Sequence, residues 1–221
     1  MTDNVIIAPS ILSGDFAYMG KSVKDVENWG ADWIHCDVMD GVYVPNFTFG
    51  MPMIEAINRN TDLPLDVHLM IDKPEKYAER FVKAGADIVT FHPEASECPE
   101  KVIDIIRKSG AKAGIVFNPN VDINKYARLF SECDMVVIMT VYAGYGGQKL
   151  IPECIERIKT VKEILMNIGS QALIEVDGGI TEDNYKSALD AGANVLVAGS
   201  SVFKSENPAR TIKTLRSVAK E

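Results

Sequence analysis

The chain has 221 residues, of which 47% are hydrophobic and 24% charged, so it can bury a sizeable core and is too apolar to be disordered. Its 23 basic and 31 acidic residues give a formal net charge of -8, which disfavours binding to nucleic acid or to an anionic membrane surface. No apolar run approaches the ~20 residues that a membrane-spanning helix needs.

The first ten residues lack the basic and apolar regions of a secretory signal, so we expect the protein not to be secreted. The four cysteines, at positions 36, 98, 133 and 154, show no C-x-x-C spacing. A chain of this length does not need disulfides to be stable. We therefore expect a cytoplasmic protein with reduced thiols.

Short runs rich in valine and isoleucine recur along the chain and are apolar on both faces, which is typical of parallel strands covered on both sides. The predicted strands are 5–9, 33–38, 65–70, 88–91, 113–117, 135–141, 172–176 and 195–198. Amphipathic stretches between them predict helices. In 74–84, for example, Tyr77, Phe81 and Val82 fall on one helical face.

Glycines mark the ends of several predicted helices. Gly30, Gly85, Gly110 and Gly192 each stand between a helical pattern and a strand. Glycine there can take the left-handed conformation that ends a helix.

This alternation of helices and strands predicts either a closed (β/α)8 barrel or a long doubly wound sheet, and periodicity leaves both open. No low-complexity linker divides the chain, so we expect one α/β domain over residues 1–221. The longest irregular stretch, 40–50, follows a predicted strand and is a candidate functional loop.

Polar residues stand at the ends of three predicted strands. His35 and Asp37 alternate along one strand and so share a face, His68 lies in the next, and Asp177 ends the seventh. Two imidazoles and two carboxylates brought together would form a site for a divalent ion such as zinc, iron or manganese. Alternatively, each histidine is a hydrogen-bonded core residue and each aspartate a helix cap. The residues meet only if the barrel closes.

Glycine-rich loops follow the last three predicted strands. Residues 144–148 read GYGGQ, 177–180 read DGGI and 198–201 read AGSS. Glycines let backbone amides approach an anion, and barrel enzymes frequently bind phosphate after strands 7 and 8. The alternative is that these glycines form ordinary turns.

Three methionines, Met39, Met70 and Met139, lie at or near strand ends. They are either core filling or an apolar wall around a reactive intermediate. Ser10, which ends the first strand, is either a cap for the following turn or a hydroxyl that binds substrate.

Taken together, these motifs resemble the ribulose-phosphate 3-epimerase family over essentially the whole chain. The matching segments, in the family's order and spacing, are 8–12 (APSIL), 35–41 (HCDVMDG), 44–46 (VPN), 66–70 (DVHLM), 146–148 (GGQ) and 176–180 (VDGGI). The resemblance implies a closed (β/α)8 TIM barrel of the ribulose-phosphate-binding type. It also implies a homo-oligomer in pentose phosphate metabolism.

The resemblance further implies a metal-dependent enzyme that interconverts D-ribulose 5-phosphate and D-xylulose 5-phosphate. His35, Asp37, His68 and Asp177 would bind one divalent ion per subunit (zinc, iron, manganese or cobalt), and Asp37 and Asp177 would exchange protons through an enediolate. The residues expected to contact the sugar phosphate are Ser10, His68, Gly144, Tyr145, Gly146, Gly147, Asp177, Gly178, Gly179, Gly199 and Ser200, with Met39, Met70 and Met139 around them.

Two segments depart from the family's usual motifs. Val42-Tyr43 replaces His-Phe, and Ala143-Gly144-Tyr145 replaces Pro-Gly-Phe. Both lie in loops that could border the site, so a D-allulose 6-phosphate 3-epimerase is the alternative enzyme. A noncatalytic sugar-phosphate-binding barrel would have no need of two acids beside a metal. A related lyase or decarboxylase would be expected to carry Asp-x-Lys-x-x-Asp, which this sequence lacks.

Overall fold

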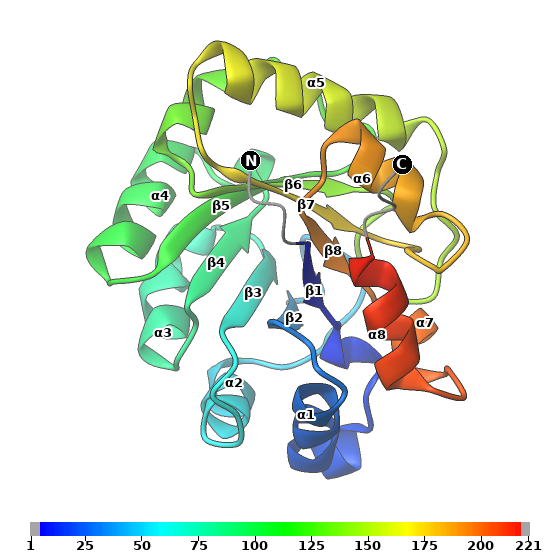
Figure 1. The fold of residues 1–221 in the computed structure, drawn as a ribbon. Helices are drawn as coiled ribbons and strands as arrows, with labels where there is room; N and C mark the ends of the chain where they lie inside the picture. Colours follow the sequence, from blue (N-terminus) through cyan, green and yellow to red (C-terminus); the bar gives the residue numbers. More distant parts are fainter. Residues whose placement is uncertain (1–4, 218–221) are drawn as a thin grey trace.

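The computed structural model describes residues 5–217, which form a closed barrel of parallel strands inside a ring of helices (Figure 1). Within this range the eight strands are β1 (Ile6–Ala8), β2 (Ile34–Met39), β3 (Leu65–Met70), β4 (Ile88–Phe91), β5 (Lys112–Phe117), β6 (Met135–Met139), β7 (Leu173–Asp177) and β8 (Val195–Val197). The α-helices of the same range are α1 (Met19–Asn28), α2 (Met51–Asn58), α3 (Ala78–Lys83), α4 (Pro99–Lys108), α5 (Cys154–Asn167), α6 (Tyr185–Ala191), α7 (Ser200–Phe203) and α8 (Pro208–Arg216). Short 3₁₀ helices are Ile11–Ser13, Phe16–Tyr18, Pro74–Lys76, Pro93–Ala95 and Ala127–Glu132.

The strands pair in the order β1-β8-β7-β6-β5-β4-β3-β2, all in parallel. The remaining edge, between β1 and β2, is joined by a bridge between Ser10 and His35. There the amide of His35 donates to the carbonyl of Pro9 at 3.1 Å. This contact closes the barrel, so the prediction of a (β/α)8 barrel is confirmed and the open sheet is excluded.

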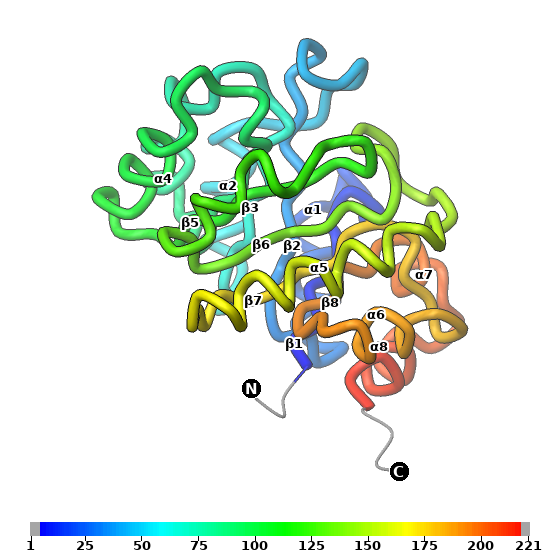
Figure 2. Tube along the Cα trace, turned by 90° about the horizontal axis from the view of Figure 1, so that it is seen from above, coloured from blue at the N-terminus to red at the C-terminus, as the bar shows by residue number. Residues whose placement is uncertain are grey.

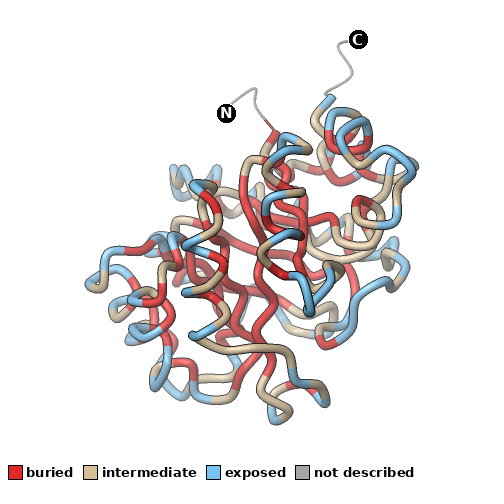
Figure 3. Tube along the Cα trace, turned by 90° about the horizontal axis from the view of Figure 1, so that it is seen from below, coloured by how far each residue is buried: buried red, intermediate tan, exposed pale blue. Residues whose placement is uncertain are grey.

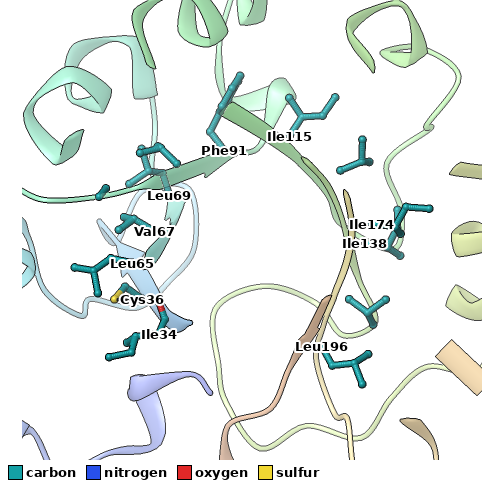
Figure 4. Packing of buried hydrophobic residues seen from close by; sticks show 14 of the residues in the cluster. Ile34, Cys36, Leu65, Val67, Leu69, Phe91, Ile115, Ile138, Ile174 and Leu196 are labelled. Carbon is teal, nitrogen blue, oxygen red and sulfur yellow. Dashed lines mark hydrogen bonds between the residues drawn. The ribbon is translucent and has the colours of Figure 1, made fainter. Parts of the chain in front are cut away.

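Side chains alternate between the two faces of the barrel wall. In β2, Ile34, Cys36 and Val38 belong to the core shared with the helices, whereas His35 and Asp37 point inward. Figure 4 shows this outer core, with Leu69, Phe91 and other apolar side chains from neighbouring strands on the outside of the strand ring. The inside therefore holds the polar residues that the sequence placed at strand ends.

The helices cover the outer face of the strands. Helix α5 lies against β6 and β7 and beside α6 (Figure 2). Figure 3 shows the strands as buried and the outer turns of the helices as exposed. No helix within residues 5–217 is long and apolar enough to cross a membrane. The four cysteines all lie in this range and all have free thiols.

The predicted strands agree with the structure to within two residues. All four helix-ending glycines have positive φ, and Gly85 (φ +114) also packs so closely that a Cβ would lie 2.4 Å from Nδ2 of Asn58. The predicted helix 74–84 is wrong in detail. It is divided at Tyr77, whose φ of -126 is not helical and whose side chain is exposed. Phe81 is buried as predicted, but Ala78 rather than Tyr77 lies buried beside it.

Candidate active site and metal centre

A cavity of about 590 Å³ opens at the carboxyl ends of the strands. Asp37 and Asp177 line it, together with residues of the loops that follow β1, β6, β7 and β8. His35 and His68 do not line the cavity, because both side chains are fully buried in the barrel. The carboxyl end of the strands is where barrel enzymes carry their active sites.

The four residues that the sequence singled out as metal ligands meet beside this cavity. His35, Asp37, His68 and Asp177 each offer one ligand atom, and these atoms all lie within 4.8 Å of one another. Oδ1 of Asp37 is 3.4 Å from both His35 Nε2 and His68 Nδ1. Oδ2 of Asp177 is 3.8 Å and 3.6 Å from the same two nitrogens.

The two ring nitrogens at the centre of this cluster fit a metal ion. His35 Nε2 and His68 Nδ1 are buried and have no hydrogen-bond partner among the described residues. A buried polar atom without a partner is costly, and a first-row divalent ion bound by two imidazoles and two carboxylates would satisfy both nitrogens. The alternative that each histidine is an ordinary hydrogen-bonded core residue does not account for these atoms.

The charges around His35 also favour a cation here. Burial by itself lowers the pKa of His35, but the carboxylates of Asp37 and Asp66 outweigh burial and raise the pKa well above its ordinary value. Burial likewise raises the pKa of Asp37, and His35 and His68 outweigh that effect and hold the pKa far below its usual range.

Two carboxylates beside Nδ1 of His35 were not predicted from the sequence to belong to the site. Asp66 in β3 lies opposite His35 in the strand register, and its Oδ2 is 2.6 Å from His35 Nδ1. Glu175 in β7 is fully buried, with Oε1 3.7 Å from the same nitrogen, and burial followed by the charge of Asp66 raises its pKa well above the ordinary value. Asp66 therefore orients His35 so that Nε2 faces Asp37, His68 and Asp177, the other members of the candidate metal site.

A third missed residue, His92, lies behind His68. Its Nε2 is 3.0 Å from His68 Nε2, and its side chain is fully buried. Burial first, and the nearby His68, lower the pKa of His92 to about 4, although Glu94 acts in the opposite direction. The sequence held a signal for all three missed residues, because Asp66 and Glu175 stand two positions before predicted ligands and His92 directly follows a strand.

The predicted substrate-binding residues at the barrel mouth are brought together. Those that line the cavity are Ser10, Met39, Met70, Met139, Gly144, Tyr145, Gly146, Gly147, Asp177, Gly178, Gly179, Gly199 and Ser200. The methionines are buried, and Met39 and Met70 pack together with Val44, so they fill the core and face the cavity at once. Lys149 is an exposed cation on the same rim.

Two glycines in these loops are required by the backbone. Gly179 has φ +67, and a Cβ there would lie 2.4 Å from the amide nitrogen of Leu150. Gly178 has φ +123, and its Cβ would lie 2.5 Å from Val141 Cγ2. The loop after β7 is thereby packed against the long loop after β6, which brings both backbones to one side of the cavity.

Loops after β2 and β6 are joined across the mouth of the cavity. Asn46 donates from Nδ2 to the carbonyl of Gly144 at 2.8 Å, and Tyr145 donates from its hydroxyl to the carbonyl of Pro45 at 3.1 Å. The irregular stretch 40–50 is thereby joined to the loop after β6, whose residues Gly144 and Tyr145 line the cavity.

Comparison with known proteins agrees with this geometry. The family model described as "Ribulose-phosphate 3 epimerase family" matches residues 6–203. The chain belongs to this family. A ribulose-phosphate 3-epimerase of Bacillus subtilis is 47% identical over 211 residues, covering 95% of this chain and 97% of the relative. One of Synechocystis is 45% identical over 218 residues, covering 98% and 95%.

A third relative gives a similar result. A protein of Arabidopsis thaliana named "Ribulose-5-phosphate-3-epimerase, chloroplastic" is 44% identical over 215 residues, covering 96% of this chain and 76% of its own.

Solved structures confirm the fold. A tryptophan synthase α-subunit of Pyrococcus furiosus matches with a TM-score of 0.70 at 14% identity, covering 96% of this chain and 97% of its own. Orotidine 5'-phosphate decarboxylase of Pyrococcus horikoshii matches with a TM-score of 0.67 at 18% identity, covering 96% and 100%. At such identities the likeness concerns the barrel alone.

Two of the departures from the family's usual motifs, Tyr43 and Ala143, belong to one hydrogen-bonded group. The hydroxyl of Tyr43 donates to Glu94 Oε1 at 2.7 Å and accepts from Asn118 Nδ2 at 2.7 Å. The same Asn118 accepts, through Oδ1, from the amide of Ala143 at 3.0 Å. Phenylalanine at 43 has no hydroxyl and proline at 143 has no amide hydrogen, so the usual residues could not make these bonds. Val42 is exposed to solvent.

Proposed function

We propose that this chain is a metal-dependent 3-epimerase that interconverts D-ribulose 5-phosphate and D-xylulose 5-phosphate. The observation that carries the proposal is the pair of carboxylates, Asp37 and Asp177, at one cavity beside two histidines whose central nitrogens have no partner among the described residues. Membership of the family and the names of the relatives at 44–47% identity support the same reaction.

Epimerisation at C3 requires removal of a proton from the carbon beside the C2 ketone and return of a proton to the opposite face. A single base cannot serve both faces. Asp37, from β2, and Asp177, from β7, approach the cavity from separate strands, so each can act as base in one direction and acid in the other. Each such positioned transfer contributes ~10²- to 10⁴-fold to the rate.

The residues that would hold the divalent ion are His35, Asp37, His68 and Asp177. When bound, the ion would supply Lewis-acid stabilisation of the negative charge that develops on the substrate, worth several kcal/mol. The surrounding residues orient these ligands. Asp66 and His92 contact the ring nitrogens of His35 and His68 that face away from the site, and Ser10 donates a hydrogen bond to Asp37.

The phosphate of the substrate would lie against the loops after β6, β7 and β8. Gly146, Gly147, Gly179 and Gly199 line that side of the cavity and leave backbone groups accessible. Several backbone amides acting together can bind a phosphate dianion without a buried cation. Met39, Met70 and Met139 would keep water from the reacting carbon.

A substrate panel tests the assignment. Purified protein is assayed for kcat/KM with D-ribulose 5-phosphate, D-allulose 6-phosphate and unphosphorylated D-ribulose, with exchange of the C3 hydrogen followed in deuterium oxide. We expect the pentose phosphate to be preferred. Preference for D-allulose 6-phosphate would assign the departures at Val42, Tyr43 and Ala143 to a longer sugar. Absence of C3 exchange with every substrate would indicate a noncatalytic barrel.

We also propose that the enzyme acts in pentose phosphate metabolism as a cytoplasmic homo-oligomer. The pathway and the homo-oligomeric state follow from the family resemblance, and light scattering of the purified chain measures the oligomeric state.

A further inference from the structure

His92 occupies the side of His68 that faces away from the metal centre. Both imidazoles are fully buried, and their Nε2 atoms are 3.0 Å apart. Two ring nitrogens approach to this distance only when one carries a proton and the other presents a lone pair. The contact is therefore directional, and one of the two rings must donate.

The metal centre decides which ring donates. His68 Nδ1 faces Asp37 Oδ1 at 3.4 Å and Asp177 Oδ2 at 3.6 Å, so Nδ1 is the nitrogen that would bind the ion. A neutral imidazole that binds through Nδ1 carries its proton on Nε2. His68 Nε2 then donates to His92 Nε2, and His92 carries its own proton on Nδ1.

The protonated Nδ1 of His92 has a carboxylate close by. Oε1 of Glu94 lies 3.5 Å from it, slightly beyond hydrogen-bond length, and also accepts the hydroxyl of Tyr43 at 2.7 Å. The ring of Tyr43 stacks on that of His92, with centroids 4.6 Å apart and an angle of 33°. Tyr43 thus packs against the face of His92, the carboxylate of Glu94 lies near its Nδ1, and Asn118 fixes the tyrosine hydroxyl.

We propose that His92 is a positioning residue for the metal ligand His68, and that it accepts the Nε2 proton of His68 so that the Nδ1 lone pair is directed at the metal centre. The inference rests on the proposed metal-dependent function and adds a residue that does not itself touch metal or substrate. The His92–Glu94–Tyr43 group is thus the counterpart of Asp66, which orients the ring of His35.

Two substitutions separate this role from simple packing. His92→Gln can place its side-chain oxygen near the position of Nε2 and still accept a hydrogen bond, whereas His92→Leu keeps bulk but offers no acceptor. Thr90→Val is the matched control, because Thr90 lies opposite His68 in the strand register and its buried hydroxyl has no partner among the described residues.

The full chain loaded with Co²⁺ is challenged with increasing chelator, and bound Co²⁺ is followed by its visible absorption spectrum. We expect His92→Leu to bind Co²⁺ ~10- to 100-fold more weakly with an altered spectrum, and His92→Gln and Thr90→Val to stay within about threefold of wild type. Equal retention by a folded His92→Leu, or equal loss in the leucine and glutamine variants, would overturn the proposal.

Wild-type protein offers a test that does not depend on a variant folding. The chain has three histidines, so nitrogen-15 NMR of the Zn²⁺-loaded protein can assign each tautomer. We expect protons on His68 Nε2 and His92 Nδ1, and a proton on His92 Nε2 would contradict the proposal. Failure of wild-type protein to bind Co²⁺ or Zn²⁺ would instead refute the metal-dependent function itself.

Discussion

Ser10 donates a 2.6 Å hydrogen bond from its hydroxyl to Oδ2 of Asp37. The other carboxylate oxygen, Oδ1, is the one that faces His35 and His68. The two oxygens of Asp37 therefore have separate surroundings, because one faces the two histidines of the candidate metal site and the other accepts a hydrogen bond from a hydroxyl at the cavity. Ser10 also caps the 3₁₀ helix Ile11–Ser13, which is one of the two alternatives that the sequence left open for this serine, and a contact between its hydroxyl and substrate stays a prediction.

This relationship predicts that Ser10→Ala lowers kcat more than it raises KM. Loss of the hydroxyl frees the carboxylate to rotate, and a lost hydrogen bond to a charged group corresponds to ~10-fold in rate, or about 1.4 kcal/mol. Steady-state kinetics with ribulose 5-phosphate gives the two constants. Ser13→Ala, on the same rim, is the control and should change kcat little.

Asp37→Asn and Asp177→Asn should each lower kcat by at least ~10²-fold, because each removes one of two bases and weakens a metal ligand. Exchange of the C3 hydrogen with deuterium is measured alongside metal content. A variant that retains metal and epimerises at the wild-type rate would refute the two-carboxylate mechanism.

Chelation should abolish activity, and a first-row divalent ion should restore it, because the cluster is of mixed imidazole and carboxylate donors. His68→Ala should lose metal, which elemental analysis of the purified protein measures. His35→Ala should also lose metal. Full activity in protein shown to be metal-free would contradict the assignment.

A larger side chain in the loops after β6, β7 and β8, against which the phosphate would lie, should weaken substrate binding. We expect KM to rise by roughly tenfold or more, equivalent to ~1.4 kcal/mol of binding. Gly146→Val is the clean test, because an added Cβ would meet only Leu12 at 3.7 Å. Gly199→Val should also raise KM, but its Cβ would lie 2.7 Å from Ser13 Oγ, so that side chain would have to move. Gly179→Val should also disturb the loop, since its Cβ would meet backbone.

The control for the phosphate loops is Lys149→Ala. Its side chain is exposed, so solvent screens its charge and KM should change by less than about threefold. A larger effect from Lys149 than from Gly146 would show that charge, rather than backbone amides, binds the phosphate.

Tyr43→Phe should lower the free energy of unfolding by about 1–2 kcal/mol, because Glu94 and Asn118 both lose a partner. Urea denaturation measures the change. Tyr77→Phe, a substitution at an exposed tyrosine, should be nearly neutral. Equal stability of both variants would show that the hydroxyl of Tyr43 contributes nothing.

Much of this protein could be predicted from the sequence, because the relevant signals are local. A strand buried on both faces needs apolar residues at successive positions, and the departures from that rule, His35, Asp37, His68 and Asp177, mark the site directly. Glycines that end helices are specified by positive φ, a property of single residues. The motifs then identified the family without knowledge of any contact.

Tertiary structure alone decided which residues stand next to one another. Periodicity says which face a side chain occupies but not its neighbour, so closure of the barrel between Ser10 and His35 was undetermined. The same holds for the partners of the two histidines. Asp66 lies opposite His35 in the register of β2 and β3, and His92 directly follows β4, which pairs with the strand of His68. Pairing across strands joins residues remote in sequence, and its free energy depends on burial and hydrogen bonding that exist only after the strands have met.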